Sequence, residues 1–176
     1  MKKYRKWLQI GILTIFVVLG VVTVANTFSA SGSSAKEGNL APEFTLYDLS
    51  GNKHSLGEYR GKAVLVNFWG TFCPPCKDEM PAIQNQYDKW KEQGLEVLGL
   101  NLGESKVTID SFVRQENVRF SILMDRNLET ARNKYNVTRY PTSFFIRPDG
   151  VIHKVYVGEM NEQIIEALVK EILPSQ

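Results

Sequence analysis

The fold of this chain is decided by one stretch, Ala63-Val-Leu-Val-Asn-Phe-Trp-Gly-Thr-Phe-Cys73-Pro-Pro-Cys76-Lys-Asp-Glu-Met-Pro81. Its apolar first part, interrupted only by Asn67, predicts a strand that is covered on both faces of a sheet. A short turn follows, and from Pro74 to Gln93 the apolar residues have the spacing of a helix. The cysteines therefore fall where a central strand turns into a helix. That setting favours a dithiol that exchanges disulfides.

Cys73 and Cys76 are the only cysteines among 176 residues. Cys73 is expected just before the first helical turn, where free backbone N–H groups and the helix dipole favour its thiolate. We therefore assign Cys73 as the attacking thiol and Cys76, one turn further and deeper, as the thiol that resolves the mixed disulfide. The intervening Pro74 and Pro75 carry no polar group for the thiolate, which favours a reductant. A purely structural bridge across so short a loop would stabilise little.

Glu79 is the expected third catalytic residue, because it lies one helical turn beyond Cys76. A partly buried carboxyl group with a raised pKa could pass a proton to or from Cys76 during exchange. The alternative is a surface carboxylate that only complements the helix N-terminus. The proton relay is the favoured interpretation.

Tyr140-Pro141-Thr142 directly precedes a predicted strand. A proline in such a turn is a candidate for a cis peptide bond, although an ordinary trans proline fits the sequence equally well. If the turn lies opposite the cysteines, the backbone of Tyr140 could pair with an extended substrate segment. Trp69 and Phe72 are expected to form an apolar rim. The expected substrate-binding residues are Trp69, Pro74, Pro75, Tyr140 and Pro141.

The other polar candidates are weaker. His54 and His153 are far apart in the sequence, so no zinc-ligand spacing is available, and no cofactor is expected beyond the cysteine pair. Glu104 follows the end of a predicted strand, where sites often lie, but a solvated loop is the favoured interpretation. The net charge of +2 and the lack of a basic stripe with aromatic residues argue against nucleic-acid binding.

The N-terminus differs from the rest of the chain. Basic residues among the first six precede an apolar run from Trp7 to Ala25. At about 1.5 Å per residue the run reaches nearly 30 Å, which predicts a signal-anchor over 7–25 with residues 1–6 in the cytoplasm and the remainder outside. A signal peptide cleaved near Ser33-Ser34-Ala35 is the alternative. Residues 26–38 are rich in Ser, Gly and Ala and predict a flexible linker before a folded domain at 39–176.

The folded domain is expected to alternate strands and helices, which implies an α/β fold with a mixed central sheet flanked by helices. An N-terminal β-hairpin comes first, and a strand and a helix are inserted in the middle. The predicted elements are strands Glu43–Leu49, Lys53–Leu56 and Ala63–Phe68, helix Pro74–Gln93, strand Leu95–Leu100, helix Val107–Gln115, strand Phe120–Met124, helix Leu128–Tyr135, strands Thr142–Ile146 and Val151–Val157, and helix Glu162–Leu173.

Together these residues resemble the thioredoxin superfamily from Asn39 to Pro174. The markers are Phe68-Trp69 before the dithiol, Cys73-Pro-Pro-Cys76, and Tyr140-Pro141-Thr142. The N-terminal hairpin, the extra strand and helix between Gly103 and Tyr135, and the expected membrane anchor are similar to the TlpA/ResA/CcmG branch. The resemblance implies a thioredoxin-like fold, a cis bond at Pro141, and an acidic residue with a functional role at Glu79.

The resemblance also implies a client. Proteins of this branch are extracytoplasmic oxidoreductases of cytochrome c maturation, which reduce the Cys-x-x-Cys-His disulfide of apocytochrome c before haem is attached. A membrane thiol carrier of the CcdA type would supply the electrons. The chain departs from related patterns at two positions. Asn67 stands where thioredoxin has a buried aspartate, which makes Glu79 the expected proton relay. Pro74 stands where such motifs commonly carry a glutamate, which removes a negative charge beside Cys73.

Four other functions are weighed against this interpretation. A general oxidant or isomerase of extracytoplasmic disulfides is the first, and a reductant for another envelope or spore client remains open beside it. A peroxiredoxin is rejected, because Val66 and Gly70 occupy the Pro and Thr positions of its motif relative to Cys73. A module that only binds a partner, with a structural bridge, is disfavoured by the short loop between the cysteines.

Overall fold

The computed structural model describes residues 35–173. Among them no helix is long and apolar enough to cross a membrane. The expected signal-anchor at 7–25 and all but the end of the expected linker lie outside the described residues. The contacts of the domain begin slightly before the expected boundary at Asn39. The backbone N–H of Gly38 donates to the carbonyl oxygen of Ile152 over 2.8 Å, and the Glu37 carboxylate accepts from the N–H of Val155 over 3.1 Å.

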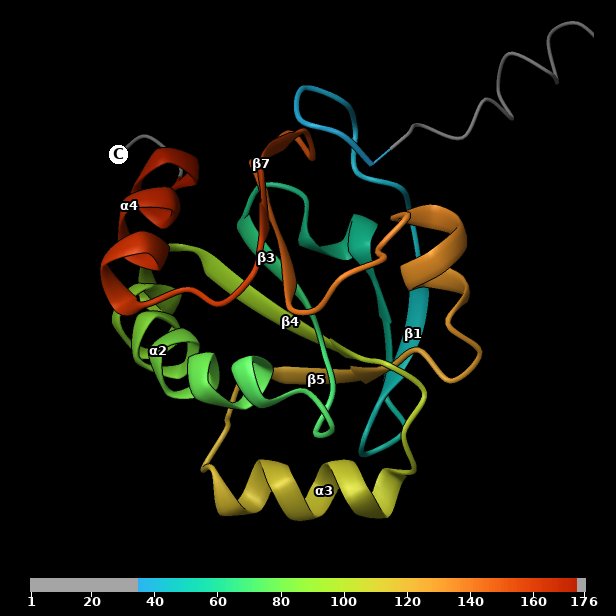
Figure 1. Cartoon of the computed structure of the whole chain (residues 1–176). Coiled ribbons are helices and arrows are strands. Elements are labelled where there is room, and N and C mark those ends of the chain that lie inside the picture. Colours follow the sequence, from blue (N-terminus) through green and yellow to red (C-terminus); the bar gives the residue numbers. More distant parts are fainter. Residues whose placement is uncertain (1–34, 174–176) are drawn as a thin grey trace, which may run out of the picture. The chain divides into compact units, whose positions relative to one another are not determined.

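A seven-stranded mixed sheet with the order β2-β1-β5-β4-β3-β6-β7 forms the centre of the domain (Figure 1). Strands β3, β4 and β5 run parallel, and β6 and β7 extend the sheet antiparallel beyond β3. The predicted mixed sheet is thereby confirmed. The N-terminal hairpin also joins this sheet, with β1 antiparallel to β5. The strands are β1 (Thr45–Asp48), β2 (Lys53–Ser55), β3 (Ala63–Trp69), β4 (Leu95–Asn101), β5 (Ser121–Met124), β6 (Thr142–Ile146) and β7 (Ile152–Val157).

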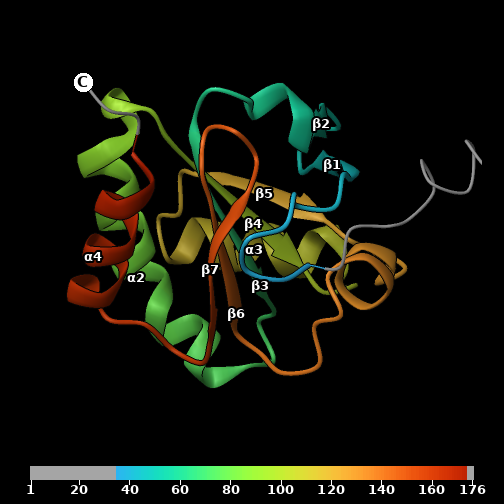
Figure 2. The same cartoon turned by 90° about the horizontal axis from the view of Figure 1, so that it is seen from above.

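Three α-helices pack on one face of the sheet and share one apolar core with it. They are α2 (Pro74–Trp90), α3 (Lys106–Gln115) and α4 (Glu162–Ile172). Helices α2 and α4 lie side by side (Figure 1 and Figure 2). The opposite core is closed by the residues around Phe44, by the 3-10 turn η1 (Leu56–Tyr59) and by the turn η3 (Glu129–Lys134). A further 3-10 turn, η2 (Lys91–Gln93), follows α2.

Strand β3 places the site residues, because all seven of its residues are buried and successive side chains point to opposite faces. Leu65 and Trp69 belong to the core beneath the helices, whereas Val66 and Phe68 belong to the other core. Asn67 therefore points to the face that carries α2. The strand ends at Trp69, and the turn after it leads directly to Cys73 at the start of that helix.

The predicted order of elements is confirmed, and one element differs in kind. The helix expected over Leu128–Tyr135 is a π-helix, η3, over Glu129–Lys134. Its start is held by the buried Asp125, whose carboxylate accepts from the N–H groups of Thr130 and Ala131 over 3.2 and 2.8 Å. Residue spacing alone indicates a helix here, but it does not distinguish the wider π turn from an α-helical one.

Candidate active site

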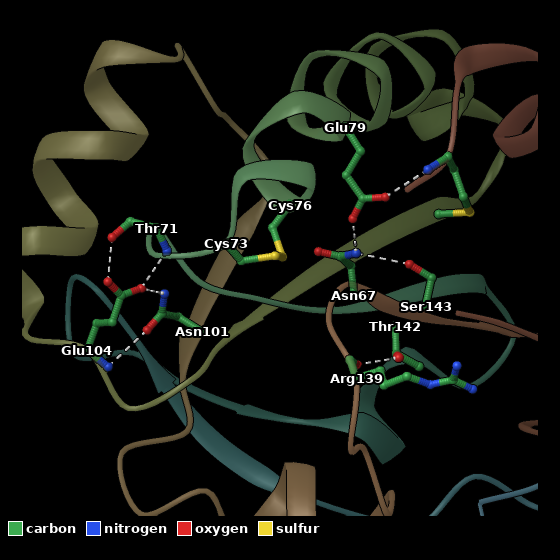
Figure 3. The surroundings of a disulfide bond; sticks show 11 residues. Asn67, Thr71, Cys73, Cys76, Glu79, Asn101, Glu104, Arg139, Thr142 and Ser143 are labelled. Carbon is green, nitrogen blue, oxygen red and sulfur yellow. Dashed lines mark hydrogen bonds between the residues drawn. A yellow bond between two sulfur atoms is a disulfide. The ribbon is translucent and has the colours of Figure 1, made fainter. Parts of the chain in front are cut away.

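Cys73 and Cys76 form a disulfide at the start of α2, with their Cα atoms 5.3 Å apart (Figure 3). Cys73 is the N-cap residue of the helix, and Cys76 lies in its first turn. Cys73 is 8% exposed and Cys76 is fully buried. The predicted placement before the helix and the greater depth of Cys76 are both confirmed. This difference in access fits Cys73 as the sulfur that meets a partner thiol and Cys76 as the resolving sulfur.

The expected free N–H groups at the Cys73 sulfur are absent from the start of the helix, and that expectation was wrong. The first two helical residues are Pro74 and Pro75, which have no N–H to offer. The next two N–H groups, of Cys76 and Lys77, donate to the carbonyl oxygen of Cys73 over 3.1 and 3.2 Å. The favourable interaction left for a Cys73 thiolate at this helix end is the helix dipole.

Glu79 is completely buried, one turn beyond Cys76. Its Oε1 accepts from Nδ2 of Asn67 over 2.7 Å, and its Oε2 accepts from the backbone N–H of Met160 over 3.1 Å (Figure 3). Burial raises the pKa of Glu79 from 4.5 to about 7, although the two hydrogen bonds act in the opposite direction. The alternative of a surface carboxylate is therefore wrong. The group can exchange a proton near neutral pH.

Asn67 connects Glu79 to the strand beside it. Its Nδ2 also donates to Oγ of Ser143 over 2.9 Å, from a fully buried position. Within residues 35–173 its Oδ1 has no hydrogen-bond partner. Rotation of the amide would let this oxygen accept a hydrogen bond from the O–H of neutral Glu79, because the two ends of an amide have nearly the same shape. Asn67 can thus serve both protonation states of the carboxyl group.

The Tyr140–Pro141 peptide bond is cis, as the resemblance implies. The turn is held by a hydrogen bond of 2.8 Å from Oγ1 of Thr142 to the carbonyl oxygen of Arg139. The ring of Tyr140 meets the ring of Phe72 edge to face, with centroids 6.3 Å apart. Residues 70–73, between β3 and α2, form the dithiol loop. Because Phe72 directly precedes Cys73, this contact brings the cis-proline turn beside the dithiol loop.

Of the two residues expected to form an apolar rim, Phe72 is exposed and Trp69 is not. Phe72 is 59% exposed beside Cys73, while Trp69 is completely buried and is not available to a substrate. Its indole packs on Phe112 of α3, with ring centroids 5.2 Å apart. The placement of Trp69 among the substrate-binding residues is therefore corrected. Its position at the end of β3 points it into the core beneath the helices. Of the two prolines between the cysteines, Pro74 is exposed and Pro75 is half-buried.

The interpretation of Glu104 as part of a solvated loop is also wrong. Its carboxylate accepts from the backbone N–H of Thr71, two residues before Cys73, over 2.7 Å. It also accepts from Nδ2 of Asn101 over 2.7 Å. Sequence reasoning missed Thr71, Asn101 and Ser143 as residues of the site. Asn101 offered a signal, because it directly follows the apolar residues 97–100 at the end of a buried strand.

The two histidines lie away from this site and have partners of their own. Nδ1 of His54 is 2.6 Å from the Tyr59 hydroxyl, and Nε2 of His153 is 2.6 Å from a carboxylate oxygen of Glu171. In the part of the chain that the structure describes, no three potential metal-ligating side chains come together.

Disulfide exchange through Cys73 and Cys76 is the chemistry that this fold and site support, and it defines the class: a thioredoxin-like thiol–disulfide oxidoreductase. The chain belongs to the AhpC/TSA family, whose model matches residues 38–155, and to the family of the ResA thiol-disulfide oxidoreductases.

Two curated relatives and one solved structure illustrate the similarity. The chain is 37% identical over 175 residues to the thiol-disulfide oxidoreductase ResA of Bacillus subtilis (strain 168), which covers 99% of this chain and 97% of the relative. It is 38% identical over 173 residues to ResA of Halalkalibacterium halodurans, which covers 98% of each. Among solved structures, the thiol:disulfide interchange protein DsbE from Chlorobium tepidum superposes with a TM-score of 0.75 at 28% identity and covers 80% of this chain and all of that one.

Proposed function

We propose that this chain is a membrane-anchored, extracytoplasmic reductase of protein disulfides. Its proposed client is the Cys-x-x-Cys-His disulfide of apocytochrome c, and its proposed electron donor is a membrane thiol carrier of the CcdA type. The observation that carries the proposal is the similarity to ResA over 99% of the chain. That span includes the basic N-terminus and the apolar run 7–25 as well as the dithiol.

The reaction starts from the reduced pair. The Cys73 thiolate attacks one sulfur of the client disulfide, which forms a mixed disulfide and releases one client thiolate. The Cys76 sulfur then attacks the Cys73 sulfur, which closes the Cys73–Cys76 disulfide and releases the second client thiolate. Two electrons pass to the client in total. Glu79, with its pKa near 7, takes the proton that Cys76 loses, and Asn67 keeps a hydrogen bond to it in either state.

The start of α2 supports the reductive direction. A strong oxidant of this kind owes its potential to a stabilised reduced form. Here Pro74 and Pro75 bring no N–H group and no polar side chain to a Cys73 thiolate. The reduced form is therefore stabilised less than in a site with free donors, which makes the pair a better electron donor. An oxidant or isomerase, and a reductant for another envelope or spore client, are the competing functions.

The first test is the reduction potential of the Cys73–Cys76 pair in the full-length chain in detergent, against glutathione and dithiothreitol buffers. We expect a value near or below that of thioredoxin, about −270 mV. A value near about −120 mV, typical of a strong oxidant, would overturn the reductive direction.

The client is tested separately. The reduced chain should reduce an oxidised Cys-x-x-Cys-His peptide faster than a matched peptide with Ala in place of the His. Equal rates would argue against apocytochrome c and in favour of a broader range of clients. The anchor is tested by alkaline carbonate extraction of membranes, from which an uncleaved chain should not be released.

A further inference from the structure

Both oxygens of the Glu104 carboxylate accept hydrogen bonds from one residue of the dithiol loop, Thr71. Oε2 accepts from the backbone N–H of Thr71 over 2.7 Å, and Oε1 accepts a short hydrogen bond from the hydroxyl of the same residue (Figure 3). Thr71 lies 33 positions away in the sequence and two residues before Cys73. Both oxygens of one carboxylate are thus bound to the turn that leads into the attacking cysteine.

Glu104 is itself held in place by the end of strand β4. Its backbone N–H donates to Oδ1 of Asn101 over 3.1 Å, while Nδ2 of Asn101 donates to Oε2 over 2.7 Å. Asn101 is fully buried and pairs in register with Trp69, the last residue of β3. The N–H of Leu102 donates to the carbonyl oxygen of Trp69 over 3.0 Å, which ties the two loops together. The Glu104 carboxylate is therefore held by the buried end of strand β4.

Other contacts hold the later part of the dithiol loop. The N–H of Cys73 donates to the carbonyl oxygen of Gly70 over 3.2 Å, which closes the turn on itself. From the helix side, Pro74 and Pro75 have no N–H with which to hold the loop. The N–H groups of Cys76 and Lys77 hold the carbonyl oxygen of Cys73, and Phe72 contacts Tyr140. The contact with Glu104 fixes the other end of the turn, because it ties Thr71 to the loop that follows the neighbouring strand.

We propose that Glu104 is a positioning residue for disulfide exchange: its carboxylate clamps Thr71 and thereby sets the orientation of the Cys73 sulfur. The inference deepens the exchange activity and does not depend on which protein is the client. In a displacement between three sulfur atoms, a small misplacement of the attacked or attacking sulfur lowers the rate strongly.

The alternative to a clamp is an electrostatic role, in which the negative charge of Glu104 raises the pKa of Cys73. Among the described residues no lysine, arginine or histidine lies within 4.0 Å of the Glu104 carboxylate to neutralise that charge. Two substitutions separate clamp from charge. Glu104→Ala removes both. Glu104→Gln removes the charge and keeps the clamp, since its oxygen can accept from Thr71 N–H and from Asn101 while its NH₂ donates to the Thr71 hydroxyl, which accepts as readily as it donates.

The experiment uses the full-length chain in detergent and the rate at which dithiothreitol reduces the Cys73–Cys76 disulfide. Glu104→Ala should lower the second-order rate constant by about tenfold or more, and Glu104→Gln should stay within about threefold of the parent. The matched control is Glu58→Ala. Glu58 also accepts a backbone N–H, that of Ser55 over 3.1 Å, but it follows the edge strand β2 at the far side of the sheet. This control should leave the rate unchanged.

The second readout is the pH dependence of Cys73 alkylation by iodoacetamide in a Cys76→Ser background. A clamp predicts that Glu104→Gln leaves the pKa of Cys73 where it is in the parent. A pKa that falls equally in Glu104→Gln and Glu104→Ala would overturn the clamp and assign Glu104 an electrostatic role. A parent-like rate in Glu104→Ala would overturn it as well.

If Glu104→Ala does not fold, Thr71→Val tests the same clamp from the other side. It removes the hydroxyl contact and keeps the backbone one, so the rate should fall by a few-fold, and an unchanged rate would refute the clamp. Dithiothreitol needs no protein client. A parent that reacts with dithiothreitol but not with the Cys-x-x-Cys-His peptide would therefore refute the proposed client and leave the clamp standing.

Discussion

Replacing Glu79 by Gln should make the oxidised protein more stable at alkaline pH. The carboxyl group is completely buried, and burial raises its pKa from 4.5 to about 7. An acid with a higher pKa in the folded state binds more protons folded than unfolded between those two values, so the free energy of unfolding falls as pH rises through this window. The difference between the two pKa values, 7 minus 4.5, corresponds to about 3 kcal/mol, lost in full above about pH 7.

The variant avoids this loss because the amide that replaces the carboxyl group stays neutral at every pH. The amide oxygen can still accept from the N–H of Met160, and the amide NH₂ can donate to Oδ1 of Asn67 after rotation of the asparagine side chain. The rotation moves the NH₂ of Asn67 to the place where Oδ1 has no partner, so one end of this amide is without a partner in the parent and in the variant alike. The substitution therefore separates the effect of the charge from the effect of a lost contact.

The assay is urea unfolding of the disulfide-intact domain from Ala35 onward, at several pH values between 5 and 8. The free energy of unfolding of the parent should fall by about 2 to 3 kcal/mol over this range relative to Glu79→Gln. The control is Glu92→Gln, which removes an exposed carboxylate beyond the far end of α2 and should follow the parent. Parallel curves for parent and Glu79→Gln would refute the raised pKa. The same variant should slow exchange and remove a step near pH 7 from its rate profile.

Four further substitutions test the site and the core of the sheet beside it. Cys73→Ala should abolish exchange, whereas Cys76→Ser should accumulate a mixed disulfide through Cys73 that non-reducing gels detect; an active Cys73→Ala protein would contradict these roles. Asn67→Ala removes a hydrogen bond that lowers the pKa of Glu79, so the pH step in stability should move above 7, and a downward move would count against this account. Gly99→Ala places a Cβ 2.8 Å from a side-chain carbon of β5, so urea unfolding should show a loss of about 1 to 3 kcal/mol; an unchanged midpoint would mean that the core yields.

The strands and helices were predictable because their signals are local. The apolar run of β3, the spacing in α2 and the turn signals between them follow from neighbouring residues alone. The solvent exposure of Trp69 and Phe72 was not predictable in this way. Both are aromatic and lie close to Cys73, yet Trp69 is fully buried and Phe72 is 59% exposed. Trp69 is buried because α3, which comes from a distant part of the chain, packs on the face of the sheet to which its indole points.

The sequence by itself determined the dithiol, its place at the start of a helix and the α/β architecture, because each depends on residues that are close together along the chain. Only the tertiary structure decided what surrounds the dithiol. Glu79 meets the N–H of Met160 across 81 positions, Asn67 meets Ser143 across 76, and Glu104 meets Thr71 across 33. Contacts of this kind are set by how helices and loops pack on the sheet. The proton affinity of Glu79 follows from the same packing, because removal of water is what raises the pKa of a carboxyl group.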